Sequence, residues 1–259
     1  MEKPSAGVGG GRLLLRLVPE LIVFIVATAA GIVSAVTGFG IGSLLTPLLA
    51  LRVDLGVAVA AVAVPHVIGT ALRFVLLKGR IDRKVLLSFG ITSAAGGLVG
   101  ALLNRFADNQ WLTLLFGALL LFAGASEISG LARRMRFRGT VAWIAGGLSG
   151  LLGGLVGNQG GIRSAALIGF NLPKEAFVAT ATAVALFVDG ARLPVYLVTQ
   201  GDQMAGLWRP IAIASIGVLL GTLIGSRTLA RIPEVWFRRI LAVVLWLLGI
   251  TMIVRGLAG

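Results

Sequence analysis

The chain has 259 residues, of which 57% are apolar and only 13% charged, and its 23 Lys and Arg outnumber 10 Asp and Glu. Soluble globular domains carry about 25% charged residues, so this composition excludes one, and the length and apolar content exclude a disordered chain. With no cysteine and one histidine, disulfides, thiolate metal sites and multi-histidine metal sites are excluded too. A polytopic membrane protein remains, for which we expect no cofactor and no bound metal.

Ten apolar segments follow one another, and none alternates at period two, which favours helices over a β-barrel. Residues 1–17 form a Gly-rich, polar N-terminal tail. No small-residue cleavage site clearly follows the first apolar segment, so we expect it to be a retained span. The predicted fold class is therefore an all-α polytopic membrane protein. Its apolar segments lie at 18–36, 43–51, 55–77, 85–104, 111–131, 140–153, 162–170, 175–199, 207–226 and 236–254.

Glycines recur in the same order in the two halves of the chain. Gly31 and Gly38 recur 116 residues later as Gly147 and Gly154. A steady order of matches with a nearly constant offset indicates an internal duplication. We therefore predict two homologous transmembrane repeats, at 18–132 and 139–259, with a basic linker at 133–138 between them.

Each half opens with a Gly-rich break and then an apolar piece, 43–51 or 162–170, which is too short to cross a bilayer. A broken helix that still crosses would make the repeats parallel, whereas a re-entrant hairpin would make them inverted. Lys and Arg outside the spans divide 13 to 7 in both cases; without the N-terminal tail they divide 13 to 4 for inverted and 10 to 7 for parallel repeats. We therefore favour inverted repeats with both termini outside, the arrangement commoner in alternating access.

Gly-interrupted segments in corresponding positions of two halves are the best sequence indication of a transporter's binding site. A break exposes the N–H groups of the following half-helix, and such positive helix ends bind anions. We expect these ends, at about Ile41–Leu44 and Gly161–Ser164, to meet. Alternatively, the glycines only allow close helix packing. The residues of the breaks expected to bind the substrate are Thr37, Gly38, Gly40, Gly42, Gly160 and Gly161.

Arg163 follows Asn158 and Gln159 on the first turn of the second half-helix. A guanidinium beside a helix N-terminus and two amides is a cradle for an oxyanion. Otherwise Arg163 snorkels to the interface or pairs with a carboxylate. Arg73 and Arg192 lie at comparable places in the two repeats and suit an anion path, although Arg73 could instead snorkel to the basic loop that follows it.

Two further ionisable residues, Asp189 and His66, are candidates for ion coupling. Asp189 shares a helix face with Arg192, three residues later, which fits either a neutralising structural pair or a role in transport. His66 follows Pro65 and fits either a proton relay or packing at a proline kink. The chain contains no H-E-x-x-H, phosphate loop or G-x-S-x-G, so we predict no catalytic residue and no enzyme activity.

The duplicated segments carry a family resemblance. The first is GIVSAVTGFGIGSLLTPLLAL (31–51), and the second is GGLSGLLGGLVGNQGGIRSAALIGF (146–170), followed by KEAFVATATAV (174–184). In this order, from about 20 to 255, the chain resembles the sulfite exporter TauE/SafE family of membrane permeases. The resemblance implies a secondary transporter that exports sulfite or a related sulfur-containing anion, such as a sulfonate or thiosulfate.

Two other functions stay open beside export. A cation-coupled importer or anion channel would have the same architecture, and a non-transporting membrane scaffold would tolerate changes at Gly160 and Gly161. We expect an integral protein of the bacterial inner (plasma) membrane. Its expected partners are a small sulfur-containing anion and membrane lipids, with no nucleic acid; a second copy of the chain, in a homodimer, is a further candidate.

Overall fold

The computed structural model describes residues 8–130, 139–158, 160–228 and 234–258, and every regular element in these ranges is helical. α1 begins at Val8, so helix extends into the segment interpreted above as an N-terminal tail. The helices are α1 (Val8–Thr37), α2 (Ile41–Ala50), α3 (Leu55–Leu77), α4 (Arg83–Val85), α5 (Ile91–Asn104), α6 (Asn109–Ser129), α8 (Thr140–Val156), α9 (Gly160–Ile168), α10 (Lys174–Gly206), α11 (Trp208–Thr228) and α12 (Glu234–Ala258), with a 3₁₀ turn at Lys78–Arg80 and a π-helical turn at Leu86–Gly90.

Seven helical stretches among the described residues are long and apolar enough to cross a membrane, and α2, α8 and α9 are shorter apolar helices. Large apolar side chains such as Val198 and Leu257 are exposed on the outer surface, as expected of a surface that faces lipid. The predicted all-α polytopic membrane fold is therefore confirmed. The seven stretches are Val18–Thr37, Leu55–Arg80, Arg83–Asn104, Asn109–Ser129, Glu175–Gly206, Trp208–Arg227 and Arg239–Ala258.

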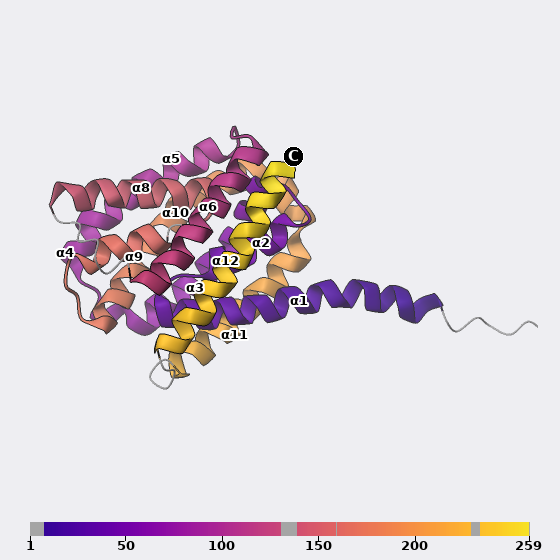
Figure 1. Ribbon diagram of the computed structural model, residues 1–259, viewed down its shortest axis with the longest axis horizontal. Helices are drawn as coiled ribbons and strands as arrows, with labels where there is room; N and C mark the ends of the chain where they lie inside the picture. Colours follow the sequence, from indigo (N-terminus) through magenta and orange to yellow (C-terminus); the bar gives the residue numbers. More distant parts are fainter. Residues whose placement is uncertain (1–7, 131–138, 159, 229–233, 259) are drawn as a thin grey trace, which may run out of the picture.

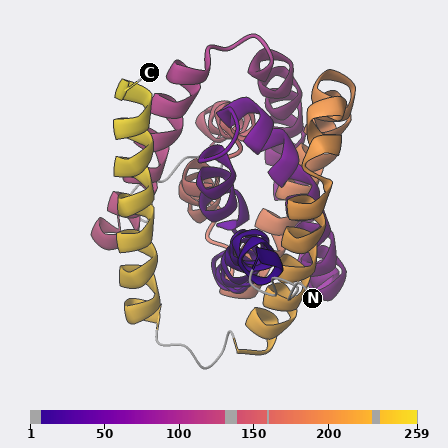
Figure 2. The same cartoon turned by 90° about the vertical axis from the view of Figure 1, so that its right-hand side faces the viewer.

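Three helix pairs pack along much of their length: α1 with α11, α5 with α8, and α6 with α12 (Figures 1 and 2). Glycine makes the first two approaches close enough for backbone to meet backbone. A Cβ added at Gly31 would lie 2.5 Å from the carbonyl oxygen of Val218, and one added at Gly154 would lie 2.7 Å from the backbone nitrogen of Ala101. Small residues at such interfaces hold helices together in lipid, where the hydrophobic effect does not.

The short helix α2 carries the chain back toward the end of the molecule from which α1 came. Glu20, near the start of the α1 span, lies 3.8 Å from Arg209 at the start of α11. Asp54, directly before α3, lines a surface pocket together with Gln203 near the end of α10. Both α1 and α3 therefore start beside the α10–α11 junction, while the last turn of α1 contacts Arg73 near the far end of α3. The pair α1–α2 is accordingly a hairpin that returns, which is the re-entrant alternative.

The pair α8–α9 returns in the same way. Both α8 and α10 run in the same direction as α5, so α9, which joins them, must run back between them. The contacts that establish these directions, in order along α5 and the turn before it, are Phe89 with Gly146, Gly90 with Phe187, Ala101 with Gly154, and Asn104 with Gln200.

The helices of the first half make the same contacts as their counterparts in the second half. α1 packs on α11 as α8 packs on α5, and α2 touches α12 as α9 touches α6. α3 and α6 pack on their own counterparts, α10 and α12. α6 and α12 run antiparallel, because Gly117 lies beside Gly249 whereas Gly124 lies beside Ala242. Antiparallel counterparts are what inverted repeats require; the duplication itself stays a prediction.

Candidate functional site

Glycines with positive φ turn the chain at both Gly-rich breaks. α1 ends at Thr37, and the chain turns through Gly40, whose φ of 126° is closed to residues with a Cβ, before α2 begins at Ile41. α8 ends at Val156, and Gly157, with a φ of 73°, turns the chain toward α9. Each break leaves one helix C-terminus and one half-helix N-terminus inside the protein.

The two breaks lie against each other at the centre of the molecule. A Cβ at Gly42 would collide with the carbonyl oxygen of Gly157. The Ser43 hydroxyl donates to the Asn158 side-chain oxygen over 3.4 Å. A Cβ at Gly160 would lie 2.5 Å from the Cβ of Phe39. The start of α2 and the start of α9 therefore share one site, where no added side chain would fit.

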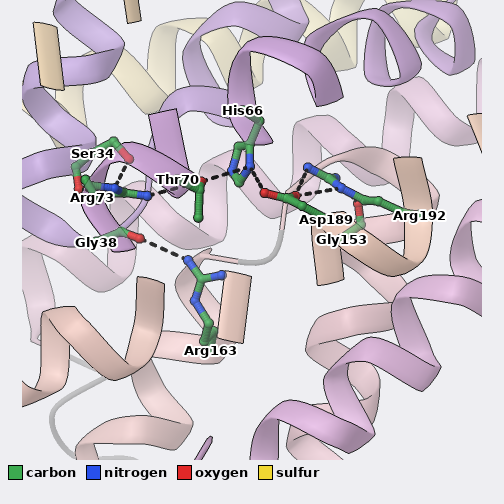
Figure 3. Close-up of polar contacts among 9 residues, drawn as sticks. All are labelled: Ser34, Gly38, His66, Thr70, Arg73, Gly153, Arg163, Asp189 and Arg192. Atoms are coloured by element: carbon green, nitrogen blue, oxygen red, sulfur yellow. Dashed lines mark hydrogen bonds and ion pairs between the residues drawn. The ribbon is translucent and has the colours of Figure 1, made fainter. Parts of the chain in front are cut away.

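Two arginines, one from each half, hold the carbonyl ends of the helices that precede the breaks (Figure 3). Arg73 of α3 donates to the carbonyl and the hydroxyl of Ser34 in the last turns of α1. Arg192 of α10 donates from Nη1 to the Gly153 carbonyl of α8 over 2.6 Å. Each carbonyl also accepts the backbone N–H four residues later, from Gly38 or Gly157. Both lie at the negative end of a helix dipole, so the guanidinium adds a second hydrogen bond and a stabilising cation. Neither arginine snorkels, since both side chains are buried.

Asp189 links the two halves. Its Oδ2 lies 2.8 Å from Nδ1 of His66 on α3, and its Oδ1 lies 2.9 Å from Nη2 and 3.0 Å from Nε of Arg192. Asp189 and Arg192, which the sequence placed on one helix face, therefore form an ion pair in the fold. The second partner of Asp189, His66, comes from the first half of the chain and lies near the middle of its helix.

Arg163 lies on α9 and donates from Nη2 to the carbonyl of Gly38, in the other break, over 3.0 Å. It is 1% exposed. Its Nε and Nη1 have no hydrogen-bond partner among the described residues. It neither snorkels nor binds a carboxylate directly, the two alternatives that the sequence left open. A buried guanidinium with two unpaired donor groups is costly unless a ligand binds it.

The centre carries excess positive charge and spare donors. Among the described residues, the buried charged side chains are three arginines, Arg73, Arg163 and Arg192, and one carboxylate, Asp189. With His66 neutral, their net charge is therefore about +2. Besides the two groups of Arg163, the Nε of Arg73 and the Nδ2 of Asn158 lack a partner in the described chain. Such an arrangement suits an anion with several acceptor oxygens.

The remaining predicted site residues have mixed surroundings. The hydroxyl of Thr37 accepts from the Phe39 N–H and lies within donating distance of the carbonyls of Phe39 and Val33, so it supports the break rather than facing a ligand. Gly161 lies in the first turn of α9. Gln159 lies outside the described residues.

Sequence reasoning missed three polar contributors. The Ser34 hydroxyl accepts a hydrogen bond from Arg73. The Thr70 hydroxyl lies 3.4 Å from Nη2 of Arg73 and 3.4 Å from Nδ1 of His66. The Tyr196 hydroxyl donates to the Gly154 carbonyl. The spacing of Thr70 between the other two residues, four after His66 and three before Arg73, places all three on one helix face and was a readable signal. Ser34 and Tyr196 had no such signal, because only tertiary packing brings them to the carbonyl ends.

A surface pocket of ≈ 570 Å³ lies at the end of the molecule where α10 meets α11. Its polar lining includes Arg52, Asp54, Gln203 and Arg255. It is separate from the buried centre, whose arginines are at most 2% exposed. The structure therefore shows the polar centre closed.

Comparison with known proteins identifies one family. The sequence model of the family described as "Sulfite exporter TauE/SafE" matches residues 23–252. No curated protein and no solved structure matches the chain. The match includes both breaks and all the buried charged residues described above.

Proposed function

Because the chain belongs to the sulfite exporter TauE/SafE family, we propose that it exports sulfite or a closely related sulfur-containing anion through the polar centre. The family makes the chain a membrane permease for sulfite or related anions, and the choice of anion, the direction and the binding residues are our proposal. We place it in the bacterial inner membrane; the homodimer stays a prediction.

One observation carries the proposal: the described buried residues at and beside the two breaks carry unpaired hydrogen-bond donors. Arg163 contributes Nε and Nη1, Arg73 contributes Nε, and Asn158 contributes Nδ2. An oxyanion between them would satisfy these donors and offset the excess positive charge. The N-terminal ends of α2 and α9 would add backbone N–H groups to the same ligand.

Alternating access follows from the way the halves meet. The site lies between α1–α2 of one half and α8–α9 of the other, so a small rotation of one half against the other would open it to either side in turn. In this proposal, the closed centre is the occluded state, and the interface glycines allow the rotating helices to stay in close contact.

The decisive experiment measures sulfite efflux from proteoliposomes at alkaline pH, where passive leakage of the neutral acid is small. We expect Arg163→Ala to abolish efflux while the protein still inserts and purifies normally, because an anion at the breaks would lose its principal cation. Arg209→Ala is the matched control, since Arg209 is exposed and distant from the breaks.

Each result has a definite reading. Wild-type efflux in Arg163→Ala would refute the assigned role of Arg163. A complete lack of flux for wild-type protein with sulfite, thiosulfate and sulfonates, together with tolerance of Gly160→Ala, would refute transport and favour the membrane scaffold.

A further inference from the structure

We propose that the pair formed by His66 and Asp189 is a proton-binding site whose occupancy is coupled to anion binding, so that a proton moves with the anion. The inference rests on the proposed function, since it assumes that the polar centre binds an anion. It adds a second transported species and assigns it to a pair that anion binding itself does not need.

The geometry specifies where the proton goes. Nδ1 of His66 faces Oδ2 of Asp189 at 2.8 Å and therefore carries the hydrogen of that bond (Figure 3). The other ring nitrogen, Nε2, is left to receive a proton from water when the centre opens to one side. The product is an imidazolium paired with the carboxylate, which raises the charge of the centre by one unit.

The pair joins the two halves at one point. His66 lies on α3 and Asp189 on α10, and the side chains of both are almost completely buried, at 7% and 0% exposure. Asp189 is the only buried carboxylate among the described residues. An ionisable pair that is buried between two spans is costly to keep, and such residues in membrane proteins mark functional sites, among them substrate pathways and proton relays.

The charged groups around His66 explain why an anion would favour its protonation. They are Asp189 and Arg192 on α10, Arg73 on α3 and Arg163 on α9; α1 and α8 face the cluster with the uncharged groups of Ser34 and Gly153. The guanidiniums of Arg192 and Arg73 oppose a further positive charge on His66, and the carboxylate of Asp189 favours it. A bound anion would offset that opposition, so anion and proton each strengthen the binding of the other by the same factor.

The test measures proton uptake on sulfite binding to the purified protein, by calorimetry in two buffers of different ionisation enthalpy. We expect wild-type protein to take up about one proton more per anion than His66→Gln. Because sulfite's own titration is the same in both samples, the difference isolates the protein. Ser93→Ala is the control, since its hydroxyl bonds to Gly146, away from the centre, and it should match wild type.

Asp189→Asn gives a second test, because this variant should bind sulfite more tightly than wild type. Removing the carboxylate raises the charge of the centre by one unit without a proton, so sulfite should bind about tenfold more tightly than to wild type at alkaline pH, with no extra proton uptake. His66→Gln should bind no more tightly than wild type at any pH. A merely destabilising change would weaken binding in both variants.

Two failures are distinguishable. If wild-type protein binds and transports sulfite but takes up the same number of protons as His66→Gln, the proton site is refuted and the anion site stands. If wild-type protein binds no sulfite, both proposals fail. Should Asp189→Asn not fold, the comparison of wild type with His66→Gln still decides.

Discussion

The break between α1 and α2 and the break between α8 and α9 occupy corresponding places in the two halves, yet they present different atoms to the centre. The first break offers the Gly38 carbonyl and the apolar ring of Phe39. The second break offers the side chains of Asn158 and Arg163, both with unpaired donors. The first break therefore presents a hydrogen-bond acceptor and an apolar ring, whereas the second presents hydrogen-bond donors. Most of the unpaired donors among the described residues come from the second half of the chain.

The halves also differ in how their capping arginines are neutralised. Arg192 has the carboxylate of Asp189 on the same helix, whereas Arg73 has only the hydroxyl of Thr70 and the groups of Ser34. The two halves thus share one backbone arrangement, but among the described residues Arg192 has a carboxylate partner and Arg73 has only uncharged partners. The packing of the two halves is therefore symmetric, whereas the pairing of their buried charges is not.

The largest expected effect comes from separating the breaks. A valine at Gly42 would drive its side chain into the Gly157 carbonyl, so Gly42→Val should cost about 3 kcal/mol or more of folding free energy and leave little folded protein. Thermal unfolding in detergent measures this. The control is Gly201→Ala on α10, where an added Cβ meets nothing within 4 Å, and it should match or slightly exceed wild type. Equal stability of both variants would show that the breaks do not need contact.

The two capping arginines should differ next in size of effect. Arg192→Leu leaves Asp189 with His66 alone; because one partner remains, we expect the low end of the cost of breaking a buried ion pair, about 3 kcal/mol. Arg73→Leu removes donors from Ser34 without stranding a carboxylate, which should cost about 1–3 kcal/mol. Chemical denaturation of both variants measures the difference. A greater loss for Arg73→Leu would contradict the charge asymmetry described above.

The smallest expected effect separates two buried asparagines. Asn158→Ala removes an unpaired amide nitrogen and only one long hydrogen bond, from Ser43 over 3.4 Å, so it should weaken sulfite binding about tenfold with little loss of stability. Asn104 uses both ends of its amide, donating to the Leu155 carbonyl and accepting from Gln200, so Asn104→Ala should lower stability by about 2 kcal/mol and leave affinity unchanged. Sulfite-induced shifts in melting temperature measure affinity. The reverse pattern would remove Asn158 from the site.

Much of the candidate site could be predicted from the sequence, because charged residues are rare in membrane-spanning segments. Arg73, Arg163, Asp189 and Arg192 stand out in apolar segments, where burial of a charge needs a reason. His66 was noticed as a lone histidine, but its bond to Asp189 joins residues 123 positions apart, which no local spacing encodes. The same holds for Ser34 and Tyr196, whose roles depend on which helix end lies beside them.

Hydropathy and glycine spacing predicted the class of the protein, its spans and its breaks, because both are local properties of the chain. The sequence by itself did not decide between crossing and re-entrant helix pairs, since the basic residues outside the spans divide 13 to 7 in both arrangements. Tertiary structure decided the course of the chain: the contacts of α1 and α3 with the α10–α11 junction, and of α8 and α10 with α5, leave α2 and α9 only the return direction. The physical reason is that direction is a relation between helices, and only packing fixes it.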